Sequence, residues 1–161
     1  MNIKIRRAED NESDILTSIS FAAKRYWKYP EEYFDVWEDE LTITPDYINQ
    51  NEVHVAKVDG KAVGFISIVE VKNDFHVKEF LIRKGFWLDH IFVHPSFIGK
   101  RVGYELIFFA KELCRGKNIG CLYILSDPNA KGFYDKIGTQ FIREVPSSIK
   151  GRTVSLYKLQ I

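Results

Sequence analysis

One segment near the middle of the chain limits the possible folds more than any other. Residues 88–93 end in an apolar run, and His94 and Pro95 interrupt it. The loop that follows carries two glycines and two cations, Gly99, Gly103, Lys100 and Arg101. A strand, a basic glycine-bearing loop and a helix start suit an anion, because N–H groups at a helix N-terminus lack intrahelical partners. The segment therefore predicts a phosphate-binding turn or, equally, a simple reversal of the chain.

Length and composition predict an ordinary globular domain. The chain has 161 residues, which favours a single domain over residues 1–161 with one core. Its hydrophobic content of 45% and charged content of 28% are those of a folded protein. The net charge of +1 gives no reason to expect nucleic acid or an acidic membrane as a partner.

The chain shows no targeting, membrane or metal signal. Its N-terminal segment is too polar for a secretory signal, and no apolar run approaches the ~18 residues of a membrane span, so we expect a cytoplasmic protein. Cys114 and Cys121 fit no metal or redox spacing and are interpreted as buried free thiols. His90 and His94 would lie roughly 13 Å apart on a strand, too far to share a metal, so none is expected.

Hydrophobic periodicity and turn residues predict a mixed sheet with helices. We expect a helix capped by Asn11 or Ser13, and a hairpin turn at Asp59-Gly60. Gly64 predicts a bulge or a close approach of another backbone. The other expected helices are 31–41, a short turn after Pro45, 99–114 and a short one near 130–137. The expected strands are 2–7, 53–58, 62–71, 86–93, 119–125, 139–145 and 153–159, with an extended insertion at 75–84.

An aromatic and acidic helical region follows the first helix. Tyr26, Trp27 and Tyr29 precede a segment whose apolar residues fall on one side. Its other side carries five acids, Glu31, Glu32, Asp35, Glu38 and Asp39. One interpretation is an amphipathic cover with a solvated acidic face. The other is a pocket wall, in which the three aromatic residues contact a substrate and a carboxylate attracts a cationic amine.

Two segments in this order resemble the GCN5-related N-acetyltransferase (GNAT) superfamily. Residues 93–103 are similar to its acyl-CoA loop, Gln/Arg-x-x-Gly-x-Gly/Ala, and residues 127–138 contain Asn-Ala-Lys-Gly-Phe-Tyr, similar to the family's Asn-Ala-x-x-Phe-Tyr. The expected order of elements matches the family's fold along nearly the whole chain. The resemblance implies an α+β fold for acyl-CoA N-acyltransfer, with a mixed, mostly antiparallel sheet of about seven strands and helices on both faces.

The resemblance implies acetyl-CoA as co-substrate and a set of binding residues. In the loop, Ile98 stands where Arg or Gln is usual, Arg101 stands at the first motif glycine, and Gly103 matches. A non-glycine residue at positive φ costs about 1–2 kcal/mol, so we expect Arg101 to avoid that conformation and to add a cation near the phosphates. The residues implied in cofactor binding are Phe92, Val93, Ile98, Gly99, Lys100, Arg101, Val102, Gly103, Asn129 and Phe133.

The family's reaction needs an acid and a base. A primary amine has a pKa near ~10 and must lose a proton before it attacks the thioester. Tyr134 matches the family tyrosine near the CoA sulfur, and is otherwise a core tyrosine. Asn129 matches the residue that binds the pantetheine arm, and is otherwise a helix N-cap. Asp89 is the first candidate for the base, and His90 is the second. The alternative for each is an ordinary strand residue with no catalytic role.

The expected function is therefore transfer of an acetyl group to a primary amine of a small acceptor. The alternatives are a non-catalytic acyl-CoA sensor on the same fold and a purely structural or interaction protein. Which acceptor is used does not follow from the residues. The segment 153–159 is a candidate sheet edge for a homodimer.

Overall fold

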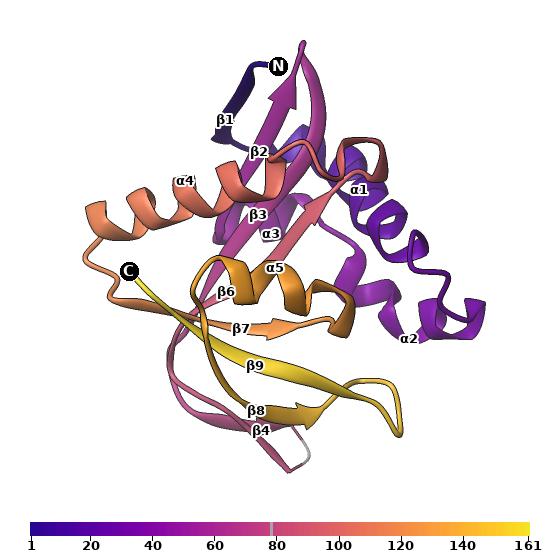
Figure 1. Ribbon diagram of the computed structural model, residues 1–161, viewed down its shortest axis with the longest axis vertical. Coiled ribbons are helices and arrows are strands. Elements are labelled where there is room, and N and C mark those ends of the chain that lie inside the picture. Colours follow the sequence, from indigo (N-terminus) through magenta and orange to yellow (C-terminus); the bar gives the residue numbers. More distant parts are fainter. Residues whose placement is uncertain (78) are drawn as a thin grey trace. The chain divides into compact units, whose positions relative to one another are not determined.

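The fold was derived from a computed structural model, which describes residues 1–77 and 79–161 (Figure 1). Lys78 lies within the predicted insertion 75–84 and is outside the described residues. The helices are α1 (Ser13–Arg25), α2 (Glu31–Leu41), α3 (Pro45–Gln50), α4 (Val102–Gly116) and α5 (Lys131–Lys136). The strands are β1 (Ile3–Arg7), β2 (Glu52–Val58), β3 (Lys61–Val71), β4 (Phe75–Val77), β5 (Phe80–Ile82), β6 (Gly85–Val93), β7 (Cys121–Ser126), β8 (Gln140–Pro146) and β9 (Thr153–Gln160).

Seven strands form one mixed sheet in the order β1-β2-β3-β6-β7-β9-β8. β6 and β7 pair in parallel, whereas the pairs β1–β2, β7–β9 and β8–β9 are antiparallel. The predicted α+β class with a mixed sheet of about seven strands is thus confirmed. The insertion 75–84 forms a separate two-stranded pair, β4–β5. β9 lies between β7 and β8, so the prediction of an exposed edge at 153–159 was wrong, and β8 is the edge strand at that end of the sheet.

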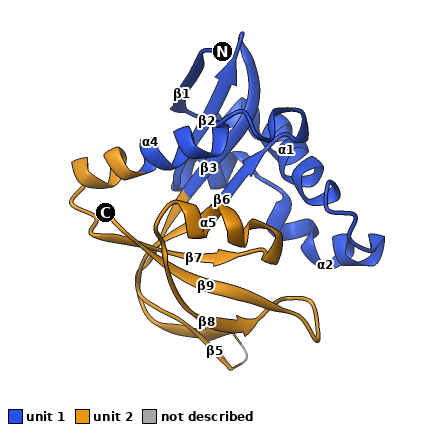
Figure 2. Ribbon diagram, viewed as in Figure 1, with its two compact units in different colours: residues 1–67, 90–110 blue, residues 68–89, 111–161 orange. Residues whose placement is uncertain are grey.

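The chain divides into two compact units (Figure 2). Unit 1 comprises residues 1–67 and 90–110, and unit 2 comprises residues 68–89 and 111–161. Three elements, β3, β6 and α4, contribute residues to both units. The expectation that 1–161 is a single domain stays a prediction, and each unit is described by itself below.

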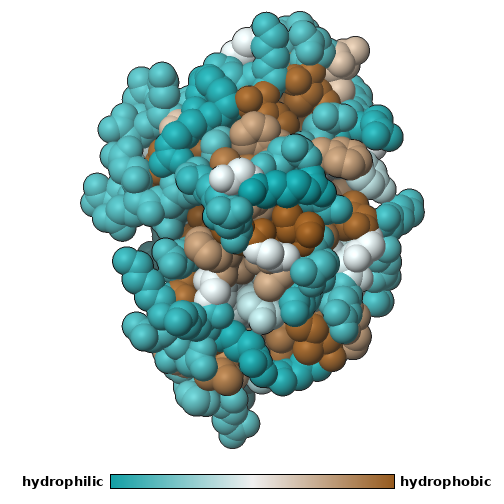
Figure 3. Space-filling view, turned by 90° about the vertical axis from the view of Figure 1, so that its left-hand side faces the viewer, coloured by the Kyte–Doolittle hydropathy of each residue, from teal (hydrophilic) through white to brown (hydrophobic). Residues whose placement is uncertain are grey.

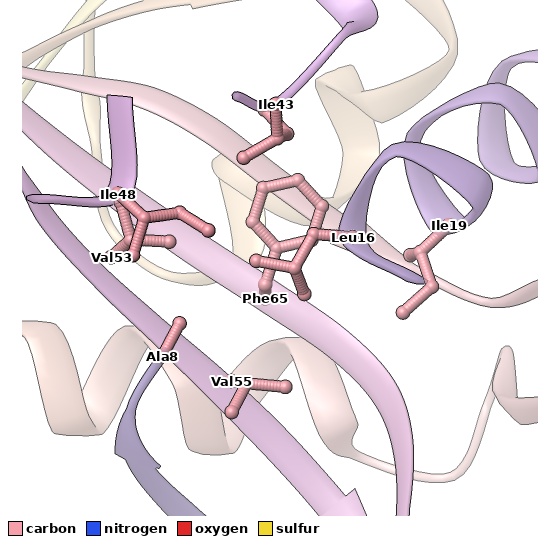
Figure 4. Packing of buried hydrophobic residues seen from close by; sticks show 8 residues of the cluster. All are labelled: Ala8, Leu16, Ile19, Ile43, Ile48, Val53, Val55 and Phe65. Carbon is pink, nitrogen blue, oxygen red and sulfur yellow. The ribbon is translucent and has the colours of Figure 1, made fainter. Parts of the chain in front are cut away.

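The core of unit 1 surrounds Phe65 of β3, which is fully buried (Figure 4). Leu16 and Ile19 of α1 and Ile48 of α3 belong to this cluster, so two helices cover this face of the strand. Ile15 is 44% exposed, because the buried face of α1 carries Leu16, Ile19 and Ser20 instead. The remaining buried members of the cluster are Ala8, Ile43, Val53 and Val55.

The other face of β3 meets α4 at Gly64, where the predicted close approach is confirmed. A Cβ at this position would lie 2.8 Å from the carbonyl oxygen of Phe92 and 3.2 Å from Cγ1 of Val102. Real side chains do not tolerate the first of these distances, and the neighbour is rigid backbone. The missing side chain of Gly64 therefore allows both the end of β6 and the first turn of α4 to lie directly against β3.

The local turns and helix caps follow ordinary backbone chemistry. Asp59 and Gly60 have φ values of 50° and 78°, which is the type I′ geometry of a two-residue hairpin. The predicted helix caps at Asn11 or Ser13 were wrong, because a 3-10 turn over Asp10–Glu12 precedes α1 and Glu9 forms a capping box with Glu12.

The core of unit 2 joins the β4–β5 pair to the C-terminal strands. Phe80 of β5, Trp87 of β6, Val145 of β8 and Leu156 of β9 form one buried cluster. Cys114 is buried, and burial raises the pKa of its thiol to about 11. Cys121 is only half-buried, so the expectation of two buried free thiols holds in full for Cys114 alone.

Exposed hydrophobic side chains on the face drawn in Figure 3 occur in separate patches bordered by hydrophilic residues. Among the exposed large side chains of the chain are Phe108, at 56%, and Phe141, at 46%. Isolated exposed apolar residues are common in globular proteins. None of the helices in the described residues is long and apolar enough to span a bilayer.

Replacing Gly64 tests the close packing of β3 against β6 and α4. Gly64→Ala should lower the free energy of unfolding by about 1–3 kcal/mol, because the new Cβ overpacks against the Phe92 carbonyl. Urea denaturation followed by circular dichroism measures the change. Gly132→Ala is the matched control, since nothing lies within 4 Å of its added Cβ, and it should be neutral or mildly stabilising. Equal stability of Gly64→Ala and the native protein would contradict the packing described here.

Candidate functional site

The loop of unit 1 reverses the chain between β6 and α4. A 3-10 turn over Pro95–Phe97 follows the strand, and Gly99 then takes a φ of 78°. Arg101 takes a φ of 67°, and its carbonyl accepts the first helical hydrogen bond from Glu105 N at 3.0 Å. α4 therefore begins at Val102, three residues later than the predicted start at Gly99.

Arg101 contradicts the expectation that it would avoid positive φ. The left-handed conformation costs a non-glycine residue about 1–2 kcal/mol, and the motif's usual glycine at this position would not bear that cost. The loop thus has at Arg101 a backbone conformation that a glycine would adopt without strain. Local strain of this kind persists where the surrounding structure fixes the backbone, and it is frequent at binding sites.

The donors of this loop suit a pyrophosphate group. Backbone N–H groups in the first turn of α4, including those of Val102 and Gly103, have no intrahelical acceptor and lie at the positive end of the helix dipole. Lys100 and Arg101 are exposed and carry two positive charges at the same helix end. The Lys100 ammonium lies 5.1 Å from the Phe97 ring, which holds it beside the loop. Ile98 is 47% exposed and contributes an apolar side chain there.

The end of β6 places Phe92 and Val93 next to this loop. The carbonyl of Phe92 faces Gly64, and the amide of His94 donates to Val63 O at 2.8 Å, so β6 stays beside β3 up to its last residue. The side chains of Phe92 and Val93 are half-buried. Their backbone thus lies on a fixed strand in unit 1.

His90 lies among aromatic rings in unit 1. Its ring centroid is 5.5 Å from that of Phe92, 6.0 Å from that of Tyr47 and 6.3 Å from that of Phe65. Tyr47 is itself fixed, because its hydroxyl donates to Ser67 Oγ at 2.8 Å. No sequence pattern indicates this arrangement, since Tyr47 and Phe65 come from α3 and β3 and approach His90 only in the folded chain.

Tyr134 is the buried residue of α5 in unit 2. It is 4% exposed, and its ring lies 5.5 Å from that of Tyr157 and 5.3 Å from that of Phe133. Burial raises the pKa of Tyr134 well above its usual value, with smaller contributions from the nearby charges of Asp127 and Tyr157. The phenol therefore stays protonated at neutral pH and is a hydrogen-bond donor.

Asn129 and Asp89 are the exposed members of the predicted site in unit 2. Asp127, not Asn129, caps the 3-10 turn over Pro128–Ala130, because its carboxylate accepts from Asn129 N at 2.9 Å. The Asn129 carboxamide also donates to Asp127, at 3.1 Å, which orients it on the surface. Asp89 is on β6, directly before His90.

The predicted aromatic wall of unit 1 divides into two groups. Tyr26 and Trp27 are 48% and 45% exposed and contact each other edge to face at 4.8 Å. Tyr29 packs instead against Trp37 of α2, at 5.0 Å. The Lys24 ammonium lies 4.4 Å from the Trp37 ring, so a cation of the chain itself already occupies this aromatic group.

The predicted site residues thus fall into two sets. Unit 1 holds those near the loop, which are His90, Phe92, Val93, Ile98, Gly99, Lys100, Arg101, Val102 and Gly103, together with the three aromatic residues. Unit 2 holds Asp89, Asn129, Phe133 and Tyr134. Within residues 1–77 and 79–161, no group of three or more His, Cys, Asp and Glu side chains is placed to hold a metal ion.

Solved structures share this fold at low sequence identity. A GCN5-related N-acetyltransferase from Rhodopseudomonas palustris is 20% identical, with a TM-score of 0.78, over 100% of this chain and 97% of that one. The PaiA N-acetyltransferase from Thermoplasma acidophilum, solved in complex with coenzyme A, is 17% identical, with a TM-score of 0.78, over 100% of both chains. A GNAT-family acetyltransferase from Staphylococcus aureus Mu50 is 18% identical, with a TM-score of 0.71, over 99% of both chains.

The sequence itself carries the family signal. No curated protein gave a significant sequence match. In contrast, the sequence model of the acetyltransferase (GNAT) family matches residues 18–139, which is most of the chain and includes the loop, β6, α4 and α5. The chain belongs to the acetyltransferase (GNAT) family, a family of acyltransferases.

Proposed function

We propose that this protein transfers an acetyl group from acetyl-CoA to a primary amine of a small acceptor, by direct attack in a ternary complex. The observation that carries the proposal is the backbone of the loop before α4, with positive φ at Gly99 and at Arg101, in a chain of this family. The coenzyme A complex of the Thermoplasma PaiA protein, which shares the fold, supports acyl-CoA as the ligand.

The residues of the loop and of β6 would hold the cofactor. The amides of Val102 and Gly103, with the charges of Lys100 and Arg101, are suited to the pyrophosphate. β6 pairs in parallel with β7 at Trp87 and Leu88, which precede Phe92 and Val93 along the strand. This supports a role for the backbone of Phe92 and Val93 in pairing with the pantetheine arm, as an added strand would. Asn129 and Phe133, which lie in unit 2, are the other residues that the family motif implies in cofactor binding.

Acetyl-CoA, when bound, supplies an acetyl group activated as a thioester. Overall, the new amide bond forms between the acceptor nitrogen and the acetyl carbon, the carbon–sulfur bond breaks, and a proton from the amine ends on the sulfur. Tyr134 stays protonated because burial raises its pKa. Its hydroxyl would therefore donate a hydrogen bond to the departing sulfur and then give it a proton. The proton that the base takes from the amine, returned through solvent, restores the phenol.

Asp89 is the proposed base and His90 the second candidate. Asp89 is exposed, and its carboxylate would attract the acceptor's ammonium group and accept its proton directly or through water. The His90 ring is half-buried among Phe92, Tyr47 and Phe65, which favours a role in shaping the acceptor's surroundings.

Acetyl-CoA-dependent release of free thiol across amine classes tests the proposed activity. At least one small primary amine should give turnover, and calorimetry should show saturable binding of acetyl-CoA. Binding without thiol release from any amine would favour a non-catalytic acyl-CoA sensor. The absence of binding at millimolar acetyl-CoA would remove the proposal altogether.

Tyr134→Phe tests the proposed proton donor. With the best amine of that screen, kcat should fall by roughly 100-fold or more, while the dissociation constant for acetyl-CoA stays within about twofold. Tyr157→Phe is the matched control, because Tyr157 is a buried neighbour whose hydroxyl donates to Asp135. A Tyr134→Phe enzyme with native kcat would show that the phenol has no part in the chemistry.

Substitution of both base candidates separates their roles. Asp89→Asn should lower kcat/KM by at least about 100-fold, since the amide cannot accept the proton. His90→Gln should mainly raise KM, because it changes the packing with Tyr47 and Phe65. The opposite pattern in steady-state kinetics would assign the base to His90.

A further inference from the structure

Unit 2 contains a cavity of about 280 Å³ that includes none of the proposed catalytic or cofactor residues. Its volume is near the lower end of the roughly 300–1,000 Å³ of small-molecule sites. Five of its lining residues are apolar or aromatic: Leu81, Trp87, Tyr123, Ile142 and Leu156. Three others are cationic: Arg83, Arg143 and Lys158. The lining thus combines an apolar wall with a concentration of positive charge.

The strand register builds one side of this cavity. Trp87 of β6 lies opposite Tyr123 of β7, and Tyr123 lies opposite Lys158 of β9. Lys158 in turn lies opposite Gln140 of β8, another lining residue. Directly opposed residues present their side chains on the same face of a sheet. The four residues therefore form a continuous row across four strands, with aromatic rings at one end and a cation next to them.

The aromatic end of the row is held in place. The indole Nε1 of Trp87 donates to the carbonyl of Arg83 at 2.9 Å, and the Trp87 ring lies 5.2 Å from that of Tyr123. Trp87 is buried and belongs to the cluster that joins β5, β6, β8 and β9. The apolar wall is thus pre-formed by the core of unit 2.

An irregularity in β8 brings a second cation to the same face. Phe141 lies opposite Tyr157, and their rings meet at 5.8 Å, whereas Arg143 lies opposite Leu156. The register shifts between Phe141 and Arg143, so Ile142 is the extra residue. Without this shift Arg143 would share the face of Phe141, away from the cavity. The shift instead places both Ile142 and Arg143 in the cavity wall.

Carboxylates in residues 1–77 and 79–161 do not neutralise the three cations. In the described part of the chain, Arg83, Arg143 and Lys158 make no ion pair with a carboxylate. The carboxylate of β8, Glu144, lies opposite Ser155 and accepts its hydroxyl at 2.5 Å, on the other face of the strand. Like charges that converge on one cavity repel each other, and a bound anion removes this repulsion.

We propose that this cavity is a binding site for a small carboxylate that bears an aromatic or branched apolar group. Guanidinium and ammonium groups bind carboxylates through charge-assisted hydrogen bonds, and the wall of Trp87, Tyr123 and Leu156 covers an apolar body. A ligand with a single ring matches the cavity's volume. The site does not depend on acetyl transfer, because its residues are separate from the proposed reaction.

Titration of the full-length protein with phenylacetate, followed by calorimetry, tests the proposal. We expect saturable binding with a dissociation constant of about 1 mM or lower. Binding should also change tryptophan fluorescence, and that change should be absent in Trp87→Phe. Phenethylamine, which has the same ring and an ammonium group, should not bind over the same concentrations. Inorganic phosphate should not compete, because it lacks an apolar body.

Charge-removing variants locate the bound carboxylate. Arg143→Gln and Lys158→Gln should each weaken phenylacetate binding at least about tenfold. Lys136→Gln, which removes an exposed charge of α5 in the same unit, should leave binding within about twofold. Thermal denaturation verifies that all three variants are folded. Lack of saturable phenylacetate binding, equal binding of phenethylamine, competition by phosphate, or equal weakening by Lys136→Gln would each overturn the proposal.

Discussion

The absence of a side chain at Gly64 sets the geometry of the candidate cofactor loop. The Phe92 carbonyl oxygen and the Val102 side chain lie 2.8 and 3.2 Å from the position that a Cβ would take. The end of β6 and the start of α4 are therefore held against one strand. Only residues 93–101 connect these two fixed points. The positive φ values at Gly99 and Arg101 are the means by which so short a connection reverses direction. The strain at Arg101 thus follows from packing around Gly64, a residue that is distant in the sequence.

The amphipathic elements were predictable because their signals are local. α2 was predicted at 31–41 and found over Glu31–Leu41, since its apolar residues recur at helical spacing after a proline. The Asp59-Gly60 hairpin and the acetyltransferase (GNAT) family were also predicted from residue patterns alone. Of the candidate site, the sequence supplied the loop and Tyr134, because a motif marks each of them.

The features that sequence reasoning missed depend on contacts between distant residues. Arg101 was expected to avoid positive φ, because propensity alone disfavours it, yet tertiary packing fixes the loop's backbone. The rings around His90 come from α3, β3 and β6 and share no sequence pattern. The register shift at Ile142, which turns Arg143 into the cavity of unit 2, has no signal in a single sequence. In each case a long-range constraint outweighed a local preference.

We propose that the backbone of this loop, and not its glycine motif, binds the pyrophosphate of acetyl-CoA. A titration of isotopically labelled protein with acetyl-CoA, followed residue by residue in amide NMR spectra, tests it most directly. The amides of Val102 and Gly103 should show the largest downfield shifts, and Arg101→Gly should keep the same pattern with weaker binding. Saturable binding of acetyl-CoA with no shift at these amides would contradict the claim.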